Sequence, residues 1–393
     1  MRFLDKLLKS SKVEWRQLGE LVEISNIGVD KKINDDETSV RLLNFVDVFK
    51  NQYISNETPT MVVTASQKKI NDCNIQKGDV FITPSSEIID EIGFSAMAVE
   101  DFNNAVYSYH IMRLRIHDKS ILSPPFLNFL FSSSEVRGQI RQKAQGITRY
   151  GLTQPNWKSI IIPIPPLNIQ QKIVEILDSF TELTAELTAE LTARKRQFEY
   201  YRENLFHFNE QRVEWKMLGD ISIIGTGKHD TKDAEKNGDY IFYARGVEPL
   251  RLNTYDFDET AIITAGDGVG VGKVFHWAVG KYALHQRAYR IVPNAEIVHP
   301  RYIYYYILTN FYPYIEKTSV NSSVTSMRKP MFLKFPIPIP SKEEQNRIVS
   351  ILDKFDTLTT SITEGLPKEI ELRKKQYEYY RDLLLTFPKK EIA

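Results

Sequence analysis

The chain contains the same unit twice, and this internal repeat constrains its fold more than any other feature of the sequence. The motif Val-Glu-Trp-x-x-Leu-Gly at residues 13–19 recurs at residues 213–219. Further matches follow in the same order, at separations of 175 and then 179 residues: His110 with His285, Arg115 with Arg290, Pro125 with Pro300, Pro155 with Pro330, 162–165 with 337–340, 170–178 with 345–353, and 194–202 with 373–381. So many collinear matches indicate two copies of one unit.

The two copies match closely at the entry motif and in their later, helical parts. Residues 22–110 and 222–285, in contrast, barely resemble each other. A duplicated scaffold with divergent surfaces indicates two different targets held at a fixed separation. The alternative is an ancestral duplication that says nothing about function.

The variable part of each copy has the pattern of a mixed α+β domain. A proline in the first helical turn predicts helices over 125–132 and 300–309. Short runs rich in β-branched and aromatic residues, separated by turn signals, predict strands at 40–46, 80–83, 109–116, 240–244, 261–264, 273–277 and 288–292.

A near-continuous helical pattern covers residues 168–206, and in its second half leucines recur every four residues. The C-terminal counterpart, 342–387, is interrupted by Gly365 and Pro367, which predict a kink or a break. An apolar stripe on a helix needs a partner in water. We therefore expect the two helical parts to form an antiparallel pair, and a second protein could cover part of the same face.

Charge and cysteine content exclude several classes of protein. Lys plus Arg is 51 and Asp plus Glu is 50, so any binding to a polyanion must use local patches rather than overall charge. The single cysteine, Cys73, excludes an intramolecular disulfide and a cysteine-based zinc cluster. Residues 1–12 predict a short amphipathic helix rather than a signal peptide, and prolines interrupt the longest apolar stretch. We expect a cytoplasmic protein without membrane contact or a metal site.

The repeated motifs resemble those of the specificity (S) subunits of type I restriction–modification systems. The resemblance rests on a doubled Pro-Ile-Pro…Gln-x-x-Ile-Val-x-Ile-Leu-Asp signature, on the doubled Arg-Lys-x-Gln-x-x-Tyr-Tyr-Arg ends, and on two tandem Thr-Ala-Glu-Leu units at 184–191. It implies target recognition domains at 1–160 (with the short helix at 1–12) and 213–335, a central conserved helical spacer at 161–212, and a C-terminal conserved helical region at 336–393.

The resemblance also implies a function. Each recognition domain would read one half of a split, asymmetric DNA site, and the antiparallel helices, related by a pseudo-twofold repeat, would set the spacer. The helices would dock two modification (methyltransferase) subunits, which restriction (translocase–nuclease) subunits then join. The chain itself would hold no cofactor, with S-adenosylmethionine, ATP and Mg in the partner subunits. The alternative is a two-headed protein–protein scaffold without DNA contact.

Two weak motifs raise the alternative of a methyltransferase within the chain. Residues 123–126 (Ser-Pro-Pro-Phe) match a motif of amino-methyltransferases, and glycines alternate over 266–272. The second copy lacks the first motif, which suits the start of a helix. The glycines precede a predicted strand, which favours a hairpin turn. We therefore expect no catalytic residue, and a structural role for His110 and His285.

Candidate DNA contacts are basic, hydroxyl and amide side chains on loops, because such groups bind phosphates and base edges. Suitable loops are 145–150 with its counterpart 321–329, 44–50 with its counterpart 245–247, and 227–229. The strongest candidates are Arg149, Arg245 and Arg328. The other predicted DNA-binding residues are Asn44, Lys50, Thr148, Tyr150, Lys228, His229, Asn321, Ser322 and Thr325.

A second set of apolar and aromatic residues lies on the helical parts. These residues either pack the helical pair or receive the modification subunits, and the sequence leaves both alternatives open. They are Leu183, Leu187, Leu191, Phe198, Tyr200, Tyr201, Tyr377, Tyr379 and Tyr380.

Overall fold

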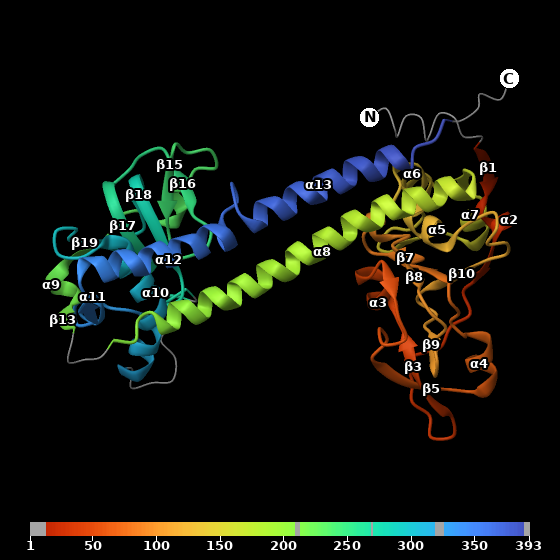
Figure 1. Cartoon of the computed structure of the whole chain (residues 1–393), viewed down its shortest axis with the longest axis horizontal. Coiled ribbons are helices and arrows are strands. Elements are labelled where there is room, and N and C mark those ends of the chain that lie inside the picture. The colour runs from red at the N-terminus through yellow and green to blue at the C-terminus, as the bar shows by residue number, and fades with distance from the viewer. Residues whose placement is uncertain (1–12, 209–212, 269, 319–325, 389–393) are drawn as a thin grey trace. The chain divides into compact units, whose positions relative to one another are not determined.

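The computed structural model describes residues 13–208, 213–268, 270–318 and 326–388. The chain forms two compact units (Figure 1). Unit 1 comprises Met1–Glu186 together with Glu371–Ala393, and unit 2 comprises Leu187–Ile370. The helix expected at 1–12 lies outside the described residues.

Unit 1 contains two main sheets and several short helices. The larger sheet has the strand order β2-β10-β6-β8-β4, and the smaller one has the order β5-β3-β9. Two apolar clusters fill the space between these sheets and the helices. The strands are β1 (Glu14–Gln17), β2 (Val22–Ser25), β3 (Thr38–Leu43), β4 (Tyr53–Ile54), β5 (Met61–Ala65), β6 (Val80–Ile82), β7 (Ser85–Ser86), β8 (Ser95–Ala98), β9 (Ala105–Tyr107), β10 (Met112–Ile116), β11 (Tyr150–Gly151) and β12 (Ile161–Ile164). The helices before α8 are α2 (Leu18–Leu21), α3 (Phe45–Lys50), α4 (Gln67–Asp72), η1 (Ile89–Glu91), α5 (Pro124–Leu130), α6 (Ser134–Lys143) and α7 (Gln154–Lys158).

Unit 2 is built on one six-stranded sheet with the order β14-β19-β17-β18-β15-β16. Its largest apolar cluster joins this sheet to α10, whose buried face carries Tyr302, Tyr305 and Phe311. The strands are β13 (Glu214–Met217), β14 (Ser222–Thr226), β15 (Tyr240–Tyr243), β16 (Leu250–Leu252), β17 (Phe257–Ala265), β18 (Phe275–Leu284), β19 (Ala288–Pro293) and β20 (Pro336–Ile339). The helices are α9 (Leu218–Ile221), η3 (Thr231–Asp233), α10 (Pro300–Thr318), α11 (Lys329–Leu333) and α12 (Lys342–Thr360). These two units confirm the α+β class predicted for each copy.

The two most obvious repeat motifs pair with each other in each unit. In unit 1 the entry strand β1 pairs antiparallel with the Pro-Ile-Pro strand β12, with Trp15 opposite Pro163. In unit 2, β13 pairs with β20 in the same register, with Trp215 opposite Pro338. A two-stranded ribbon therefore closes each copy onto its own beginning, which explains why the two motifs recur together.

The helical parts confirm the sequence-based prediction. Helix α8 (Leu167–Asn204) is continuous, whereas its counterpart is divided into α12 and α13 (Leu366–Leu384). Gly365 lies at the break with a φ of +86°, a conformation that favours glycine. In unit 1, α8 and α13 run in opposite directions (Figure 1), and Phe180 stacks on Tyr380 with ring centroids 5.3 Å apart.

The aspartate at the end of the repeated signature binds a tyrosine of a neighbouring element, from α8 in unit 1 and from α12 in unit 2. Asp178 accepts a 2.6 Å hydrogen bond from the hydroxyl of Tyr53 on β4. The equivalent Asp353 accepts a 2.6 Å hydrogen bond from the hydroxyl of Tyr305 on α10. It also forms an ion pair with Arg301, with 2.8 Å between Arg301 Nε and Asp353 Oδ1. The same carboxylate position thus holds a tyrosine from a different element in each unit.

Strand register corrects part of the repeat alignment. On β10, Arg113 lies opposite Ser25, and on β19, Arg290 lies opposite Gly225. Ser25 and Gly225 are 200 residues apart, like the entry motifs, so Arg113 rather than Arg115 is the counterpart of Arg290. The predicted match of Arg115 with Arg290 is therefore wrong by two residues.

The same correction applies to the histidines. The bridge between Val29 and Ser108 corresponds to the bridge between His229 and His285. Ser108, and not His110, is therefore the counterpart of His285. Both predicted matches relied on residue identity alone, whereas the pairing partners on the neighbouring strand determine the true equivalence.

Of the two proline-initiated helices, the second begins at Pro300 as predicted, and the first begins one residue earlier than predicted. Pro124, not Pro125, is the first residue of α5, as Pro300 is the first residue of α10. The residue before each helix donates its backbone N–H to a buried glutamine of the signature. Ser123 N donates to Gln170 at 2.9 Å and His299 N donates to Gln345 at 2.8 Å.

Residues 44–50 are the clearest local difference from prediction. The strand expected to reach Val46 ends at Leu43, and α3 follows instead of a loop. Asn44 caps this helix by accepting from the Val46 N–H, and Asp47 accepts from the Asn44 N–H, which together form a capping box. The glycines at 266–272 do connect two antiparallel strands, with Thr264 opposite Phe275, as expected.

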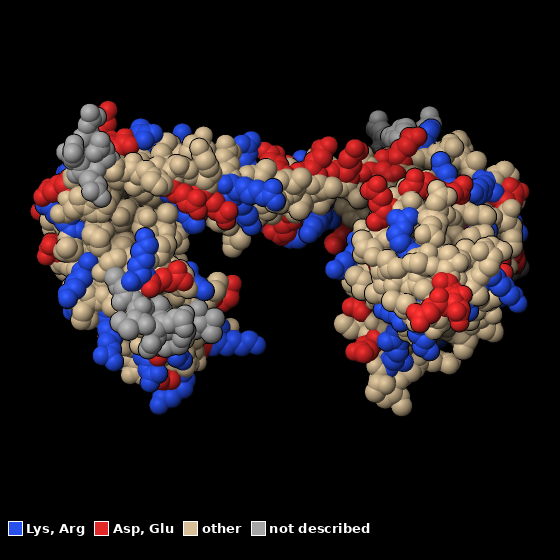
Figure 2. Space-filling model, turned by 90° about the horizontal axis from the view of Figure 1, so that it is seen from below, with Lys and Arg blue, Asp and Glu red and all other residues tan. Residues whose placement is uncertain are grey.

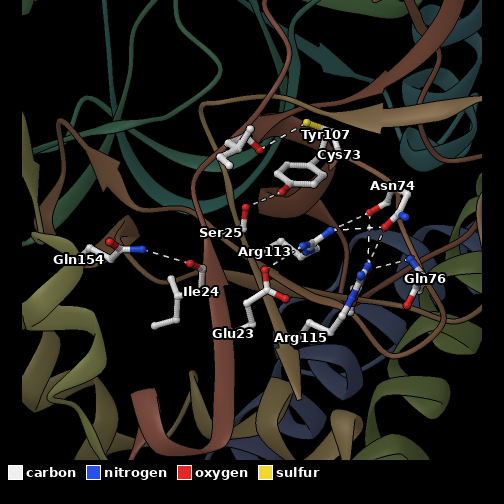
Figure 3. A network of polar contacts seen from close by, with 12 residues as sticks. Glu23, Ile24, Ser25, Cys73, Asn74, Gln76, Tyr107, Arg113, Arg115 and Gln154 are labelled. Atoms are coloured by element: carbon white, nitrogen blue, oxygen red, sulfur yellow. Dashed lines mark hydrogen bonds and ion pairs between the residues drawn. The ribbon is translucent and has the colours of Figure 1, made fainter. Parts of the chain in front are cut away.

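The equivalent arginines of the central strands belong to the interior. Figure 3 shows Arg113 and Arg115 pointing towards Asn74, and Arg113 lies 5.5 Å from the ring of Tyr107. In unit 2, Arg290 donates to Glu259 at 2.7 Å and lies over the ring of Phe257. These contacts hold the guanidinium groups against neighbouring side chains within each unit.

Candidate functional site

Three loops of unit 2 meet at one carboxylate. Arg245 follows β15, Asp267 follows β17, and Arg287 lies in the turn between β18 and β19. Arg245 Nη1 lies 3.0 Å from Asp267 Oδ1, and Arg287 Nη1 lies 3.0 Å from Asp267 Oδ2. We call these three residues the arginine–carboxylate cluster. Two of its members, Arg245 and Asp267, line a cavity of about 580 Å³ together with Gly246 and Gly268.

The backbone under the arginine–carboxylate cluster is held by two histidines. His285 Nδ1 accepts the N–H of Arg287 at 2.9 Å, and His276 Nε2 lies 3.2 Å from Gly246 O. Burial lowers the pKa of both imidazoles, and the nearby positive charge of Arg245 lowers that of His285 further. Both imidazoles are therefore mainly neutral at pH 7, which suits a role in fixing the loops.

Electrostatics favour an ionised Asp267. Burial raises its pKa, but the hydrogen bonds and charges of Arg245 and Arg287 outweigh this effect and hold the pKa below its ordinary value. The side chains of Arg245 and Arg287 are 40% and 63% exposed. The arginine–carboxylate cluster thus presents two accessible guanidinium groups with a net charge of +1.

Unit 1 has a corresponding loop cluster at the equivalent position. Ser85 pairs with Gly151, and Asp267 pairs with Ser326. Gly151 and Ser326 are 175 residues apart, like the Pro-Ile-Pro strands, so Ser85 is the counterpart of Asp267. Arg149 Nε donates to Ser85 Oγ at 3.1 Å.

Other groups extend the loop cluster of unit 1. Burial lowers the pKa of His110, and the charges of Lys31 and Arg149 lower it further. The loop that contains Arg149 exposes Ile147 almost completely, at 93%. Basic, hydroxyl and apolar side chains thus lie together here, which are the groups that contact phosphates, base edges and thymine methyl groups.

Several predicted DNA-binding residues take part in local structure. Asn44 caps α3, and Lys50 is exposed at the end of that helix. His229 Nε2 and Lys228 Nζ each lie 3.2 Å from Asp256 Oδ1, with the His229 side chain only 18% exposed and that of Lys228 76% exposed.

The remaining predicted residues lie in the loops before the Pro-Ile-Pro strands. Thr148 is exposed, and Tyr150 is half-buried where it pairs with Ser86. Arg328 is exposed and precedes α11 at the N-cap position. It is the counterpart of Thr153, the N-cap of α7, rather than of Arg149. The predicted residues Asn321, Ser322 and Thr325 lie outside the described part of the chain.

Sequence reasoning missed Asp267, Arg287 and Ser85 as members of these clusters. Arg287 follows the histidine that was aligned two residues out of register, so its equivalence was hidden. Asp267 lies in the glycine run at 266–272, whose pattern predicted only a hairpin turn. The usable signal was the strand end before each loop, because residues that follow neighbouring strands at one edge meet in space.

The predicted partner-binding residues divide into two sets. Phe198 and Tyr201 stack on Phe355 of α12 in unit 2, with ring centroids 6.2 and 5.4 Å apart. Tyr377 and Tyr380 pack against the main apolar cluster of unit 1, and Leu183, Leu187 and Leu191 are half-buried. The equivalent residues Tyr200 and Tyr379, in contrast, are 63% and 59% exposed.

The surface charge of both units is mixed. On the face shown in Figure 2, Lys and Arg lie beside Asp and Glu on both units. Within the described ranges, no group of three or more His, Cys, Asp and Glu side chains is placed to hold a metal ion. None of the helices in those ranges is long and apolar enough to cross a membrane.

Comparisons with known proteins agree with the repeat. The family model described as "Type I restriction modification DNA specificity domain" matches residues 10–194 and 211–372. The chain is 33% identical to the "Type I restriction enzyme EcoR124I/EcoR124II specificity subunit" of Escherichia coli, over 100% of this chain and 98% of that protein.

Solved structures share the fold at low sequence identity. The S subunit of a type I restriction–modification system from M. genitalium is 15% identical, with a TM-score of 0.58 over 97% of this chain and 98% of that chain. A chain from a structure of a type I R-M system is 15% identical, with a TM-score of 0.61 over 96% of this chain and 98% of that chain. The doubled family match and the full-length relative show that the chain belongs to the specificity subunits of type I restriction–modification systems.

Proposed function

We propose that this chain is the DNA-recognition subunit of a type I restriction–modification complex. Each unit reads one half of a split, asymmetric site, through recognition domains at 1–160 and 213–335. The observation that carries the proposal is the pair of equivalent loop clusters. The same strand positions present Ser85 with Arg149 in one unit and the arginine–carboxylate cluster in the other. An identical framework with different reading groups suits two different half-sites.

The helices serve as the spacer and as a docking surface. Both Thr-Ala-Glu-Leu units lie within the uninterrupted helix α8. Four residues add about 6 Å of helix and about 40° of net rotation, and one base pair adds about 3.4 Å. Inserting a further unit should therefore lengthen the spacer of the recognised site by one or two base pairs and leave both half-sites unchanged.

Partner subunits supply the chemistry in this proposal. Two modification (methyltransferase) subunits bind the helical parts, with Tyr200 and Tyr379 as the most exposed aromatic candidates, and restriction (translocase–nuclease) subunits join them. S-adenosylmethionine, ATP and Mg act in those partners, and this chain contributes no catalytic residue. The chain works in the cytoplasm, where its DNA lies.

The deciding experiment maps modified adenines in host DNA with and without this gene. The proposal expects one asymmetric bipartite motif that disappears when the gene is deleted. The competing function is a two-headed protein–protein scaffold without DNA contact. A modification pattern that is unchanged by deletion, together with no motif for the purified complex, would favour that scaffold.

A further inference from the structure

We propose that Asp267 is a positioning residue that fixes Arg245 and Arg287 so that the pair reads guanine in the half-site recognised by unit 2. This inference rests on the proposed DNA-recognition function and assigns a specificity-determining role to residues of the second unit. The chemical class that it predicts is the major-groove edge of guanine, which offers two acceptors, O6 and N7.

The geometry leaves the reading edge of each guanidinium available. Arg245 and Arg287 both approach Asp267 through Nη1, and each takes a separate carboxylate oxygen at 3.0 Å. The Nε and Nη2 atoms of both groups make no hydrogen bond to any residue in the described ranges. These two atoms form one of the two edges with which arginine donates two parallel hydrogen bonds.

The positions of Arg245 and Arg287 are fixed by contacts to their backbone as well as by the carboxylate of Asp267. His285 holds the backbone of Arg287, and His276 lies against the carbonyl of Gly246, the neighbour of Arg245. A long arginine side chain otherwise loses conformational freedom when it binds, which weakens binding. Two arginines that Asp267 already orients lose less conformational freedom, and a fixed guanidinium adapts less readily to the acceptor pattern of another base.

Charge gives the inference a second, independent signature. Asp267 neutralises one of the two positive charges, so the arginine–carboxylate cluster attracts phosphates less than two unpaired arginines would. Removing the carboxylate should therefore strengthen sequence-independent binding while it weakens sequence selection. A purely structural role would reduce both properties together.

Unit 1 supplies a matched internal comparison. Its counterpart of Asp267 is Ser85, which accepts from Arg149 Nε through its hydroxyl at 3.1 Å. Replacing Ser85 should affect only the half-site of unit 1. The two substitutions Asp267→Ala and Ser85→Ala therefore test the same framework position on two different half-sites.

The test uses the purified complex of this chain with its modification subunits. Methylation is measured on duplex pools in which each half-site is randomised separately, and the products are sequenced. Asp267→Ala should reduce the preference for guanine in the half-site of unit 2 by roughly 5- to 150-fold, with the other half-site unchanged. It should also steepen the salt dependence of binding to unrelated duplex DNA, by up to about one unit in log K against log salt.

Two further variants complete the design. Arg287→Lys should reduce the same guanine preference, because lysine cannot donate along two parallel bonds. Lys281→Ala removes a positive charge at the opposite end of the β17–β18 pairing and should leave both half-sites unchanged. Hydrogen exchange of residues 285–300 shows whether each variant has kept its fold. If Asp267→Ala has lost its fold, Asp267→Asn takes its place.

The outcomes separate the two proposals. If wild-type complex selects a bipartite site and Asp267→Ala keeps its guanine preference within twofold, the positioning role is refuted and DNA recognition stands. If the wild-type complex selects no bipartite site, the proposed function itself fails. A half-site of unit 2 that contains no guanine would also refute the inference.

Discussion

The buried glutamine of the signature should stabilise the junction between helix α8 and unit 1. Gln170 is fully buried, and its amide makes three hydrogen bonds. Oε1 accepts from Ser123 N at 2.9 Å, and Nε2 donates to Ile121 O and Pro165 O, both at 2.8 Å. Gln170→Ala removes all three bonds and leaves these backbone groups without that partner.

The expected cost follows from the number and the burial of the orphaned groups. An unpaired buried polar group costs about 1–3 kcal/mol, and less where water can reach it. Ser123 is half-buried and Pro165 is buried, so we expect Gln170→Ala to cost about 2–4 kcal/mol. The counterpart Gln345 makes two such bonds, to His299 N and Pro340 O, and its replacement should cost about 1–3 kcal/mol.

Hydrogen exchange followed by mass spectrometry measures this effect in each unit separately. In Gln170→Ala, amides of residues 121–131 should exchange roughly 30- to 800-fold faster, whereas amides of residues 299–308 should not change. Gln345→Ala should give the converse pattern. Gln170→Glu keeps the acceptor for Ser123 N and replaces the donor, so it separates the cap from the two carbonyl contacts.

A clear result would refute the reasoning. If Gln170→Ala leaves the exchange of residues 121–131 within twofold of wild type, the glutamine contacts do not hold the junction. If both segments change together in either variant, the two units do not respond independently.

Three further predictions concern stability and recognition. In chemical denaturation, Gly365→Ala should lower the free energy of unfolding by about 1–3 kcal/mol, because φ is +86° and an added Cβ would lie 2.5 Å from Thr357 O. The control Gly138→Ala should be neutral or stabilising, because no atom lies within 4 Å of the added Cβ. Burial lowers the pKa of His276 and His285, so the folded state binds fewer protons than the unfolded state, and urea denaturation should show unit 2 losing stability as the pH falls from 7 to 5. A pH-independent midpoint would contradict this. Ile147 is 93% exposed on the loop of Arg149, so Ile147→Ala should keep the free energy of unfolding within about 0.5 kcal/mol but weaken methylation of the cognate site. Unchanged methylation kinetics would show that Ile147 does not belong to the DNA interface.

The features that sequence predicted well are those with long-range regularity. The helical periodicity of 168–206 was sufficient to predict α8, and Gly365 with Pro367 was sufficient to predict the break before α13, because both depend on local backbone preference. The repeat itself predicted that the entry motif and the Pro-Ile-Pro stretch recur together, and the structure adds that they pair.

The features that sequence missed depend on register and on contacts between distant segments. The residues at 44–50 were predicted as the end of a strand and a loop, but the capping box of Asn44 and Asp47 favours a helix. The counterpart of Arg290 was misplaced by two residues, because only the partner strand reveals which arginine faces Ser25 or Gly225. Asp267 could not be linked to Arg245 and Arg287 before three separate loops were brought together.

The composition of unit 1 has a consequence for synthesis on the ribosome. Unit 1 is discontinuous, and its main apolar cluster includes Leu384, Leu385 and Phe387 from the end of the chain. Unit 2 is a single contiguous segment that ends at Ile370. At about 5–20 residues per second, the first 186 residues wait roughly 10–40 s for the segment that completes their core. During translation, unit 2 can therefore finish folding first, and the nascent N-terminal half is the part that needs protection from aggregation.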